Sequence, residues 1–227
     1  MVKISDVVRD LIARSPFLTE ALDQGLINHS ALARQLMPHV QERLGKEVRE
    51  GAVVMAIKRL PATQLSTPGR KLRAFFRQLS DISVRSNLLA YTFRNSDTLL
   101  TKQTRLLERI GEFPNLFYTF SHGIGETTIL LSDVLVEEME SLFEQEQLLD
   151  MARDLSAVTL LLPEENRQIY GIYYFILREL AWRGINMVEL ISTSNEFTLI
   201  IQEADLERSF QVLMALRNRP DTTFDLR

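Results

Sequence analysis

The 227-residue sequence predicts an α+β fold in which a small all-helical unit precedes two tandem domains with the element order βαββαβ. Apolar residues recur at helical spacing through residues 1–60, whereas strand-like apolar runs begin only at about residue 83. Between them, residues 61–69 (PATQLSTPG) have the prolines and small polar residues of a linker. The order strand, helix, strand, strand, helix then occurs twice, which is typical of tandem ferredoxin-like units.

The helical N-terminal domain is assigned to residues 1–60. Asn28 is a good N-cap for its third helix, in which apolar residues repeat every fourth position and Pro38 is expected to kink or divide the helix. A last helix is predicted from Lys46 to Leu60. A linker and a connecting helix, with basic side chains interleaved among apolar ones, are expected at 61–82.

The two sheet-forming domains are assigned to residues 83–154 and 155–227. The final strand of the first copy has two interpretations: either Leu148 to Asp154 supplies it, or it is missing. A closing strand of the second copy is expected at 222–226. Periodicity predicts the other strands at 86–93, 116–121, 127–131, 157–162, 187–193 and 197–201, and helices at 97–111, 134–147, 171–183 and 205–217.

Composition and charge exclude several classes of protein. The sequence has no cysteine, which excludes disulfides, thiolate metal sites and cysteine catalysis. It has neither an apolar run of about 18–20 residues nor a signal-peptide core at its start, so a soluble cytoplasmic protein is expected. Residues 1–80 carry 13 basic and 7 acidic side chains, whereas residues 81–227 carry 13 and 23. The basic part is interpreted either as a phosphate-binding module or as a solvated helix face.

No catalytic site is predicted. His29, His39 and His122 lack the spacing of metal ligands, and the sequence contains no glycine-rich phosphate loop. The carboxylates of the predicted helix at 134–147, Glu146 among them, are interpreted as a solvated acidic face. Neither a metal nor a cofactor is expected, and the protein is predicted not to be an enzyme.

A strand at 157–162, a helix that begins with Gly171-Ile172, and a Gly184-Ile185-Asn186 segment before the next strand form a recognisable pattern. This pattern resembles the ACT domain, a small-molecule sensing module of amino-acid metabolism. Residues 171–201 (GIYYFILRELAWRGINMVELISTSNEFTLII) are most similar to the regulatory region of aspartate kinases. The resemblance implies paired ACT domains that assemble into a homodimer or a higher oligomer. The large catalytic domain of those kinases has no counterpart here, so no phosphoryl transfer is expected.

The resemblance also implies an amino-acid effector site in the second copy. The loop before the helix and the first helical turn would hold the effector's carboxylate, which suits the free N–H groups of a helix start. An acidic Glu189 would suit a cationic amino acid. The first copy has no glycine in its equivalent loop at 93–97 and is predicted to be a pairing scaffold. The implied ligand-binding residues are Ile169, Tyr170, Gly171, Ile172, Tyr173, Asn186, Met187, Val188, Glu189, Ser194 and Asn195.

The helical unit followed by an ACT pair resembles stand-alone prokaryotic regulators of amino-acid metabolism. Residues 27–36 (INHSALARQL) are similar to the first half of a helix-turn-helix, with the helix at 46–60 in the recognition position. The alternative interpretation is a helical oligomerisation or docking module. One hypothesis is therefore an amino-acid-responsive regulator, in aspartate-family metabolism, that binds DNA; the other is a subunit that docks on a metabolic enzyme such as an aspartate kinase. The candidate nucleic-acid contacts are Lys46, Arg49, Lys58, Arg59, Arg70 and Lys71.

Overall fold

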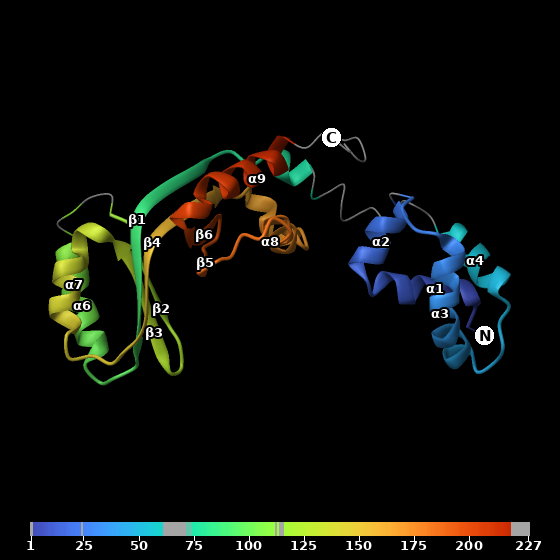
Figure 1. Cartoon of the computed structure of the whole chain (residues 1–227), viewed down its shortest axis with the longest axis horizontal. Coiled ribbons are helices and arrows are strands. Elements are labelled where there is room, and N and C mark those ends of the chain that lie inside the picture. Colours follow the sequence, from blue (N-terminus) through green and yellow to red (C-terminus); the bar gives the residue numbers. More distant parts are fainter. Residues whose placement is uncertain are drawn as a thin grey trace. The chain divides into compact units, whose positions relative to one another are not determined.

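The computed structural model describes residues 2–23, 25–60, 72, 74–111, 113 and 116–218. Contacts divide the chain into two compact units (Figure 1). The predicted linker at 61–69 and the predicted closing strand at 222–226 lie outside the described residues. The helical unit comprises Met1–Ala74, Ile169–Gly171 and Arg219–Arg227, and the sheet unit comprises Phe75–Gln168 and Ile172–Asn218.

The helical unit is built on α1 (Ile4–Ala13), α2 (Pro16–Asp23), α3 (His29–Leu44) and α4 (Glu50–Lys58). The apolar faces of α1, α3 and α4 meet in one core. The side chains with no exposed surface in this core are Val8, Ile12, Ala33, Val40 and Val53.

The structure confirms one of the predicted features of α3 and α4 and differs from two others. Asn28 caps α3 as predicted, since its side chain accepts hydrogen bonds from the backbone N–H groups of Ser30 and Ala31 at 3.0 and 3.2 Å. Pro38 does not divide α3, which continues through it. α4 begins at Glu50 and not at Lys46, because the loop between the helices folds back to bury Val48 in the core.

The sheet unit contains a six-stranded antiparallel sheet in the order β2-β3-β1-β4-β6-β5. The succession strand, helix, strand, strand, helix occurs twice along the chain, as the sequence predicted. The elements are β1 (Ile82–Arg94), α6 (Leu99–Ile110), β2 (Tyr118–His122), β3 (Glu126–Ser132), η1 (Asp133–Leu135), α7 (Val136–Phe143), β4 (Leu148–Leu161), η2 (Glu164–Gln168), α8 (Ile172–Ala181), β5 (Glu189–Ser192), β6 (Glu196–Gln202), η3 (Glu203–Asp205) and α9 (Leu206–Asn218).

The long central strands β1 and β4 belong to both copies. The segment from Leu148 to Asp154 pairs with the C-terminal half of β1 and so supplies the final strand of the first copy. From Leu155 onward β4 pairs with β6 and opens the second copy. The other side of this half pairs with Ile82–Arg85 of β1, in the position that a closing strand of a βαββαβ unit takes. The boundary assigned between residues 154 and 155 therefore falls inside one continuous strand.

Asn87 and Asp154 lie where the two central strands, which pair with each other on both sides of these residues, each gain a second neighbour. Their φ angles are +58° and +54°, the left-handed region that Asn and Asp tolerate better than other residues with a Cβ. The β1–β4 register shifts beside Asn87. Beyond these points each copy joins its first strand to its third by a hydrogen bond between threonines, Thr92 to Thr128 at 3.0 Å and Thr159 to Thr198 at 2.8 Å.

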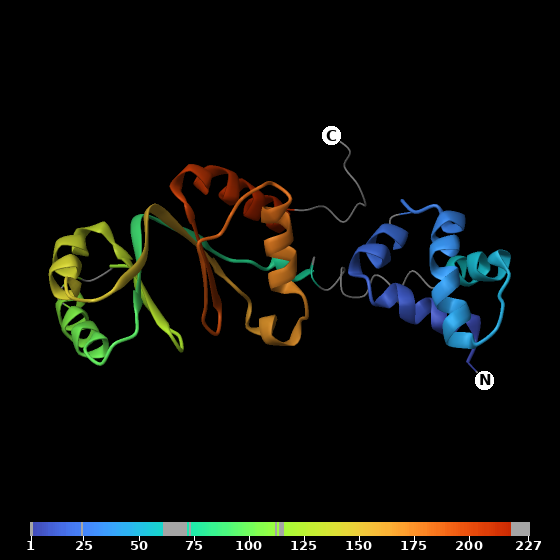
Figure 2. The same cartoon turned by 60° about the horizontal axis from the view of Figure 1, so that its bottom comes forward.

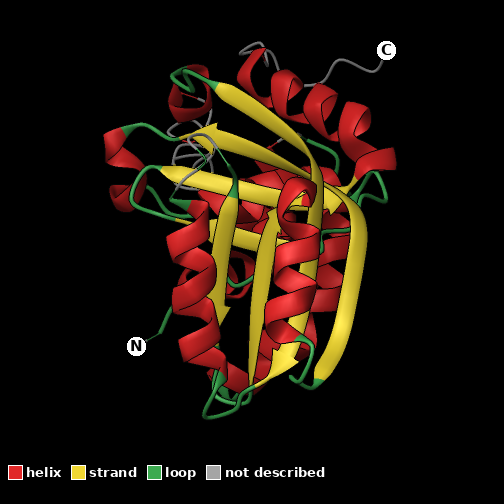
Figure 3. Cartoon of the chain, turned by 90° about the vertical axis from the view of Figure 1, so that its left-hand side faces the viewer, coloured by secondary structure: helices red, strands yellow, loops and turns green. Residues whose placement is uncertain are grey.

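Within the sheet unit, α6, α7, α8 and α9 lie outside a curled sheet (Figures 2 and 3). In the first copy, α6 and α7 cover one face of β1 and β3, and the core between them includes Leu106, Ile129, Leu131 and Met139, all fully buried. A second, smaller cluster fills the opposite, inner face of the sheet. Its members include Leu88, Leu130, Leu155 and Ile200.

The curl of the sheet brings its two edge strands together. The Ser121 hydroxyl of β2 donates a hydrogen bond of 2.8 Å to the Glu189 carboxylate of β5, although these strands occupy opposite ends of the sheet order. Side chains of the two copies thus meet directly at the open edge. Among the described helices, none is long and apolar enough to cross a membrane.

Candidate functional site

The first turn of α8 is the centre of the predicted effector site. The chain leaves η2, passes Ile169 and the 91% exposed Tyr170, and enters the helix after Gly171, whose φ is +86°. A Cβ at Gly171 would meet only Leu72 Cδ1 at 3.7 Å, an ordinary contact, so the positive φ and not a lack of space requires glycine. Gly184, with a φ of +67°, follows the C-terminal end of α8 in the left-handed conformation that often ends a helix.

Three hydrogen bonds fasten the segment before α8 to the turn between β5 and β6. The Asn166 side-chain amide donates to the Ser194 carbonyl at 2.8 Å, and the Arg167 guanidinium donates to the Ser194 hydroxyl at 2.6 Å. The Leu162 N–H donates to the Asn195 carbonyl at 2.6 Å. Ser194 and Asn195 thus lie beside the segment that leads to α8, and Arg167 adds an exposed cation to it.

A second contact ties α8 itself to the end of β5. The hydroxyls of Tyr173 and Ser192 lie 3.0 Å apart, and the Tyr173 ring packs on Phe197 with the ring centroids 4.6 Å apart. Ser192 and Phe197 are cross-strand partners, so both face α8. Ile172, by contrast, is buried and supplies core packing.

Glu189 lies on the opposite face of the sheet. Its cross-strand partner is Ile200, a member of the inner cluster, and its carboxylate accepts the hydrogen bond from Ser121. Asn186, Met187 and Val188 form the segment before β5. The structure therefore brings Tyr173, Ser194 and Asn195 to the α8 side of the sheet and separates Glu189 from them.

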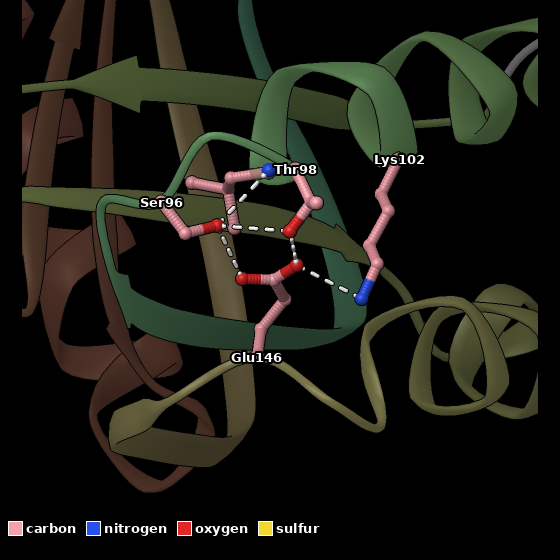
Figure 4. A network of polar contacts seen from close by, with 5 residues as sticks. Ser96, Thr98, Lys102 and Glu146 are labelled. Atoms are coloured by element: carbon pink, nitrogen blue, oxygen red, sulfur yellow. Dashed lines mark hydrogen bonds and ion pairs between the residues drawn. The ribbon is translucent and has the colours of Figure 1, made fainter.

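The start of α6 occupies the equivalent place in the first copy, and a carboxylate of the chain itself fills it (Figure 4). The hydroxyls of Ser96 and Thr98 donate to the two oxygens of Glu146 at 2.6 and 2.7 Å. The Lys102 ammonium lies 2.8 Å from Oε1. The Ser96 hydroxyl also accepts the Leu99 N–H of the first turn at 3.1 Å. Ser96 thus connects the helix start to the carboxylate.

Burial and hydrogen bonding act in opposite directions on Glu146. Burial alone would raise the pKa of its carboxyl group, but the hydrogen bonds from Lys102, Ser96 and Thr98 and the charge of Lys102 lower that pKa from 4.5 to about 2. The side chain is 3% exposed. The interpretation of Glu146 as part of a solvated helix face is wrong, because α7 ends at Phe143 and the chain then turns the carboxylate inward.

Other acids of the same predicted face are also engaged. Arg109 forms an ion pair with Glu138 at 2.6 Å. The Tyr91 hydroxyl donates to Glu140 at 2.8 Å, and burial together with this carboxylate raises the pKa of Tyr91 to about 12. The acidic segment after β3 therefore fixes α7 to its neighbours through specific partners.

The candidate nucleic-acid residues do not form a recognition helix in the predicted way. Lys46 and Arg49 lie in the loop before α4, and Lys58 and Arg59 lie at its C-terminal end, all four exposed. Glu50, at the start of α4, pairs with Arg34 at 3.0 Å. Arg70 and Lys71 lie outside the described residues.

Two surface hollows of the described residues lie away from the α8 start. One, of about 420 Å³, lies between α6 and α7 and is lined by residues that include Arg105, Arg109 and Glu138. Another, of about 510 Å³, lies between α1 and α3 beside Arg14 and His39. Among the described residues, no cluster of His, Asp and Glu could hold a metal ion. Neither hollow contains a residue of the predicted effector set.

Comparison with known proteins gives the fold of the sheet unit. No protein-family model matches the sequence, and no curated protein matches it either. Similar solved structures include the aspartokinase alpha and beta subunits (TM-score 0.50, 15% identity, 62% of this chain and 99% of that one). The ligand-free regulatory subunit of aspartate kinase from Thermus thermophilus has a TM-score of 0.50 at 8% identity, covering 61% of this chain and 97% of that one. Aspartate kinase from Clostridium acetobutylicum has a TM-score of 0.52 at 12% identity, covering 62% of this chain but 35% of that one.

These likenesses agree with the resemblance found in the sequence. The structural neighbours are regulatory subunits and domains of aspartate kinases, and the mixed helix and strand unit with its antiparallel curled sheet has their fold. The likeness is one of fold. Regulation, effector and partners are therefore argued from this chain's own residues below.

Two residues of the candidate site were missed in the sequence. Arg167 comes two residues after a pair of glutamates and shortly before the loop to α8. A cation at this place in the sequence could have indicated a carboxylate-binding residue. The sequence gives one sign that Glu146 differs from the acids of α7. It lies after Phe143, the last buried residue of that helix, and shortly before a strand. Its partner Ser96 is 50 residues away in sequence, which no local pattern reveals.

Proposed function

We propose that the chain is a non-catalytic regulatory protein whose second βαββαβ copy binds an amino acid at the start of α8. The observation that carries this proposal is the contrast between the two helix starts. At α6 a carboxylate of the chain itself is bound, whereas at α8 an exposed cation, Arg167, stands on the segment that enters the helix. A carboxylate from outside is the ligand that a helix start and a guanidinium both favour.

The residues for such a ligand lie on the α8 side of the sheet. Arg167 would keep its bond to the Ser194 hydroxyl, which orients it, and bind the carboxylate with the other N–H groups of its guanidinium. The hydroxyls of Tyr173 and Ser192, both exposed, offer further donors and acceptors. A preference for a cationic amino acid would need Glu189 on the same side. Glu189 is on the inner face, so the proposed effector is recognised through its carboxylate.

The helical unit is the proposed output element, and protein docking suits it better than DNA binding. Residues 1–60 hold nine basic and seven acidic side chains, so the basic excess of the first 80 residues comes mainly from 70–77. A DNA-binding surface needs a concentrated positive charge. The unit instead exposes large apolar side chains, including Phe17 at 67% and Leu26 at 59%. We propose that it contacts a metabolic enzyme, with the sheet units pairing into a homodimer or higher oligomer.

Thermal melting of the whole chain against the twenty amino acids, each at millimolar concentration, tests the sensor proposal. An amino acid that binds the folded state at a hundredfold excess over its Kd stabilises it by about 2.7 kcal/mol, so one or a few of them should raise the midpoint selectively. Arg167→Ala should abolish the shift. Arg183→Ala, which removes an exposed arginine at the far end of the same helix, should keep it. The absence of a shift with every amino acid would contradict the proposal.

The output proposal has its own test. The purified chain should not retard duplex DNA in a gel at low salt, with or without amino acids, because residues 1–60 are nearly neutral. A partner enzyme should instead co-purify with the chain and be lost when Phe17 and Leu26 are both replaced by Ser. Retardation of DNA that weakens with salt would favour the DNA hypothesis over docking.

A further inference from the structure

We infer that the first βαββαβ copy is permanently liganded by its own chain: the Glu146 carboxylate occupies a carboxylate-binding cradle at the start of α6. Where the second copy is an effector site, as proposed above, this makes the two copies functionally unequal. The first is held in an occupied state, and only the second responds to a ligand from outside.

The cradle has the chemistry of a carboxylate receptor. It presents two hydroxyl donors and an ammonium group, from Ser96, Thr98 and Lys102, to a single carboxylate, and both carboxylate oxygens are bonded. Charge-assisted bonds of this length are the strong ones in proteins. The side chains of Lys102 and Glu146 are 18% and 3% exposed, while Ser96 and Thr98 lie at the surface, so the ion pair is the better shielded part of the cradle.

Glu146 does not belong to α6, the helix whose start forms the cradle. It lies in the short connection between α7 and β4, where its N–H donates to the Phe143 carbonyl at 2.8 Å. The connection anchors one end of the side chain, and the carboxylate extends to another element 50 residues earlier in the sequence. Figure 4 shows the carboxylate between the loop before α6 and Lys102 of α6, and Glu146 reaches both from a separate part of the chain.

The position of the carboxylate matches the position of the proposed ligand in the second copy. Both α6 and α8 follow the first strand of their copy, and both are preceded by a loop that bonds to the hairpin between the copy's second and third strands. In the first copy the Asn95 N–H donates to the Gly125 carbonyl at 3.0 Å; in the second the Leu162 N–H donates to the Asn195 carbonyl at 2.6 Å. The two loops therefore share this backbone hydrogen bond to the hairpin. In the first copy the carboxylate beside the loop belongs to Glu146 of the chain itself.

Replacing Glu146 by Ala should convert the cradle into a binding site for small free carboxylates. The substitution removes the side chain beyond Cβ, a group one carbon smaller than propionate, and leaves Ser96, Thr98 and Lys102 in place. We expect propionate at about 50 mM to raise the melting temperature of Glu146→Ala by several degrees more than that of the unmodified chain, with sodium chloride of equal ionic strength as reference. Propionamide, which has the same shape without the charge, should have no such effect.

Three variants sharpen this test. Glu146→Gln should not respond to propionate, since its amide still fills the cradle. Thr98→Val in the Glu146→Ala background should weaken the response, because it removes one donor. Glu144→Ala, which removes an exposed carboxylate two residues earlier, should behave as the unmodified chain does.

This test is independent of the sensor proposal. It measures the melting temperature of a variant with propionate, whereas the sensor proposal is tested on the unmodified chain with amino acids. If Glu146→Ala melts at the same temperature as the unmodified chain, or gains no more from propionate than the unmodified chain does, the inference is overturned. If Glu146→Ala does not fold in chloride, recovery of the fold in propionate supports the inference, and failure to recover contradicts it.

Discussion

The starts of α6 and α8 have equivalent positions in the two copies but contain different groups. The α6 start binds Glu146 through three donors, and the α8 start presents Arg167 on an exposed segment. A single carboxylate, supplied by a connection between a helix and a strand, is enough to turn a ligand cradle into a structural joint. The two copies therefore differ in the groups at one equivalent position without any change in their topology.

The largest expected loss of stability follows from a substitution in β4, the strand that both copies share. Leu155 lies where β4 passes from one copy to the other, and its side chain is fully buried in the inner cluster. Leu155→Ala should destabilise the sheet unit by about 2–5 kcal/mol, as deletions of buried leucines do. Chemical denaturation followed by circular dichroism measures this. Leu161→Ala, at a 39% exposed position of the same strand, is the control and should cost far less. Separate unfolding of the two copies in Leu155→Ala would contradict the shared core.

The next largest loss of stability is expected from Glu146, which joins the α7–β4 connection to the start of α6. Because the folded-state pKa of Glu146 is lowered to about 2 from 4.5, its contribution to stability is fully present above about pH 4.5 and is lost as the pH falls toward 2. Glu146→Gln should therefore cost about 2–3 kcal/mol at neutral pH, since one pKa unit corresponds to about 1.4 kcal/mol. Denaturant unfolding at pH 7 and near pH 2 measures the difference. A cost that is equal at both pH values would contradict this account.

A smaller effect is expected at the second copy. Ser194 orients Arg167 through a bond of 2.6 Å, so Ser194→Ala should weaken binding of the amino acid found in the melting screen by about three- to tenfold, or roughly 1 kcal/mol. Isothermal calorimetry measures the Kd. Ser132→Ala, which removes a hydroxyl in the first copy, is the control. Equal weakening in both variants would mean that the α8 start is not where the ligand binds.

The smallest effect is expected where the copies meet at the sheet edge. Ser121 and Glu189 are joined by a single hydrogen bond near solvent, which contributes about 0.5–1 kcal/mol at most. Ser121→Ala should lower the free energy of unfolding by no more than that and leave effector affinity unchanged, because Glu189 is on the face opposite α8. Binding that strengthens for lysine or arginine in this variant would place Glu189 in the effector site after all.

Local pattern was sufficient for most of the fold. The change of periodicity near residue 83, the cap at Asn28 and the left-handed glycine after α8 are all short-range features, and the structure has each of them. What the pattern could not show is pairing between distant segments. Ile82–Arg85 completes the sheet beside the second half of β4, more than 70 residues later, and nothing in its own four residues indicates this partner.

The candidate site divides in the same way. Gly171 was found because its conformation is a local property. Strand alternation could have placed Glu189 on the inner face, since Ile191, two residues on, faces the inner cluster. Glu146 was out of reach, because the helical spacing of its neighbours suggested a solvated face and its partners lie in a distant loop. Contacts over long sequence separations build the α6 start, and single-sequence periodicity does not encode them.

An NMR titration of the uniformly labelled chain with the amino acid found in the melting screen distinguishes the two helix starts. Amide shift changes are expected at 166–175 and 192–195, around the α8 start, and none at 95–102, around the α6 start that Glu146 fills. Changes centred on 95–102, or no localised change with any amino acid, would contradict the division of labour between the two copies.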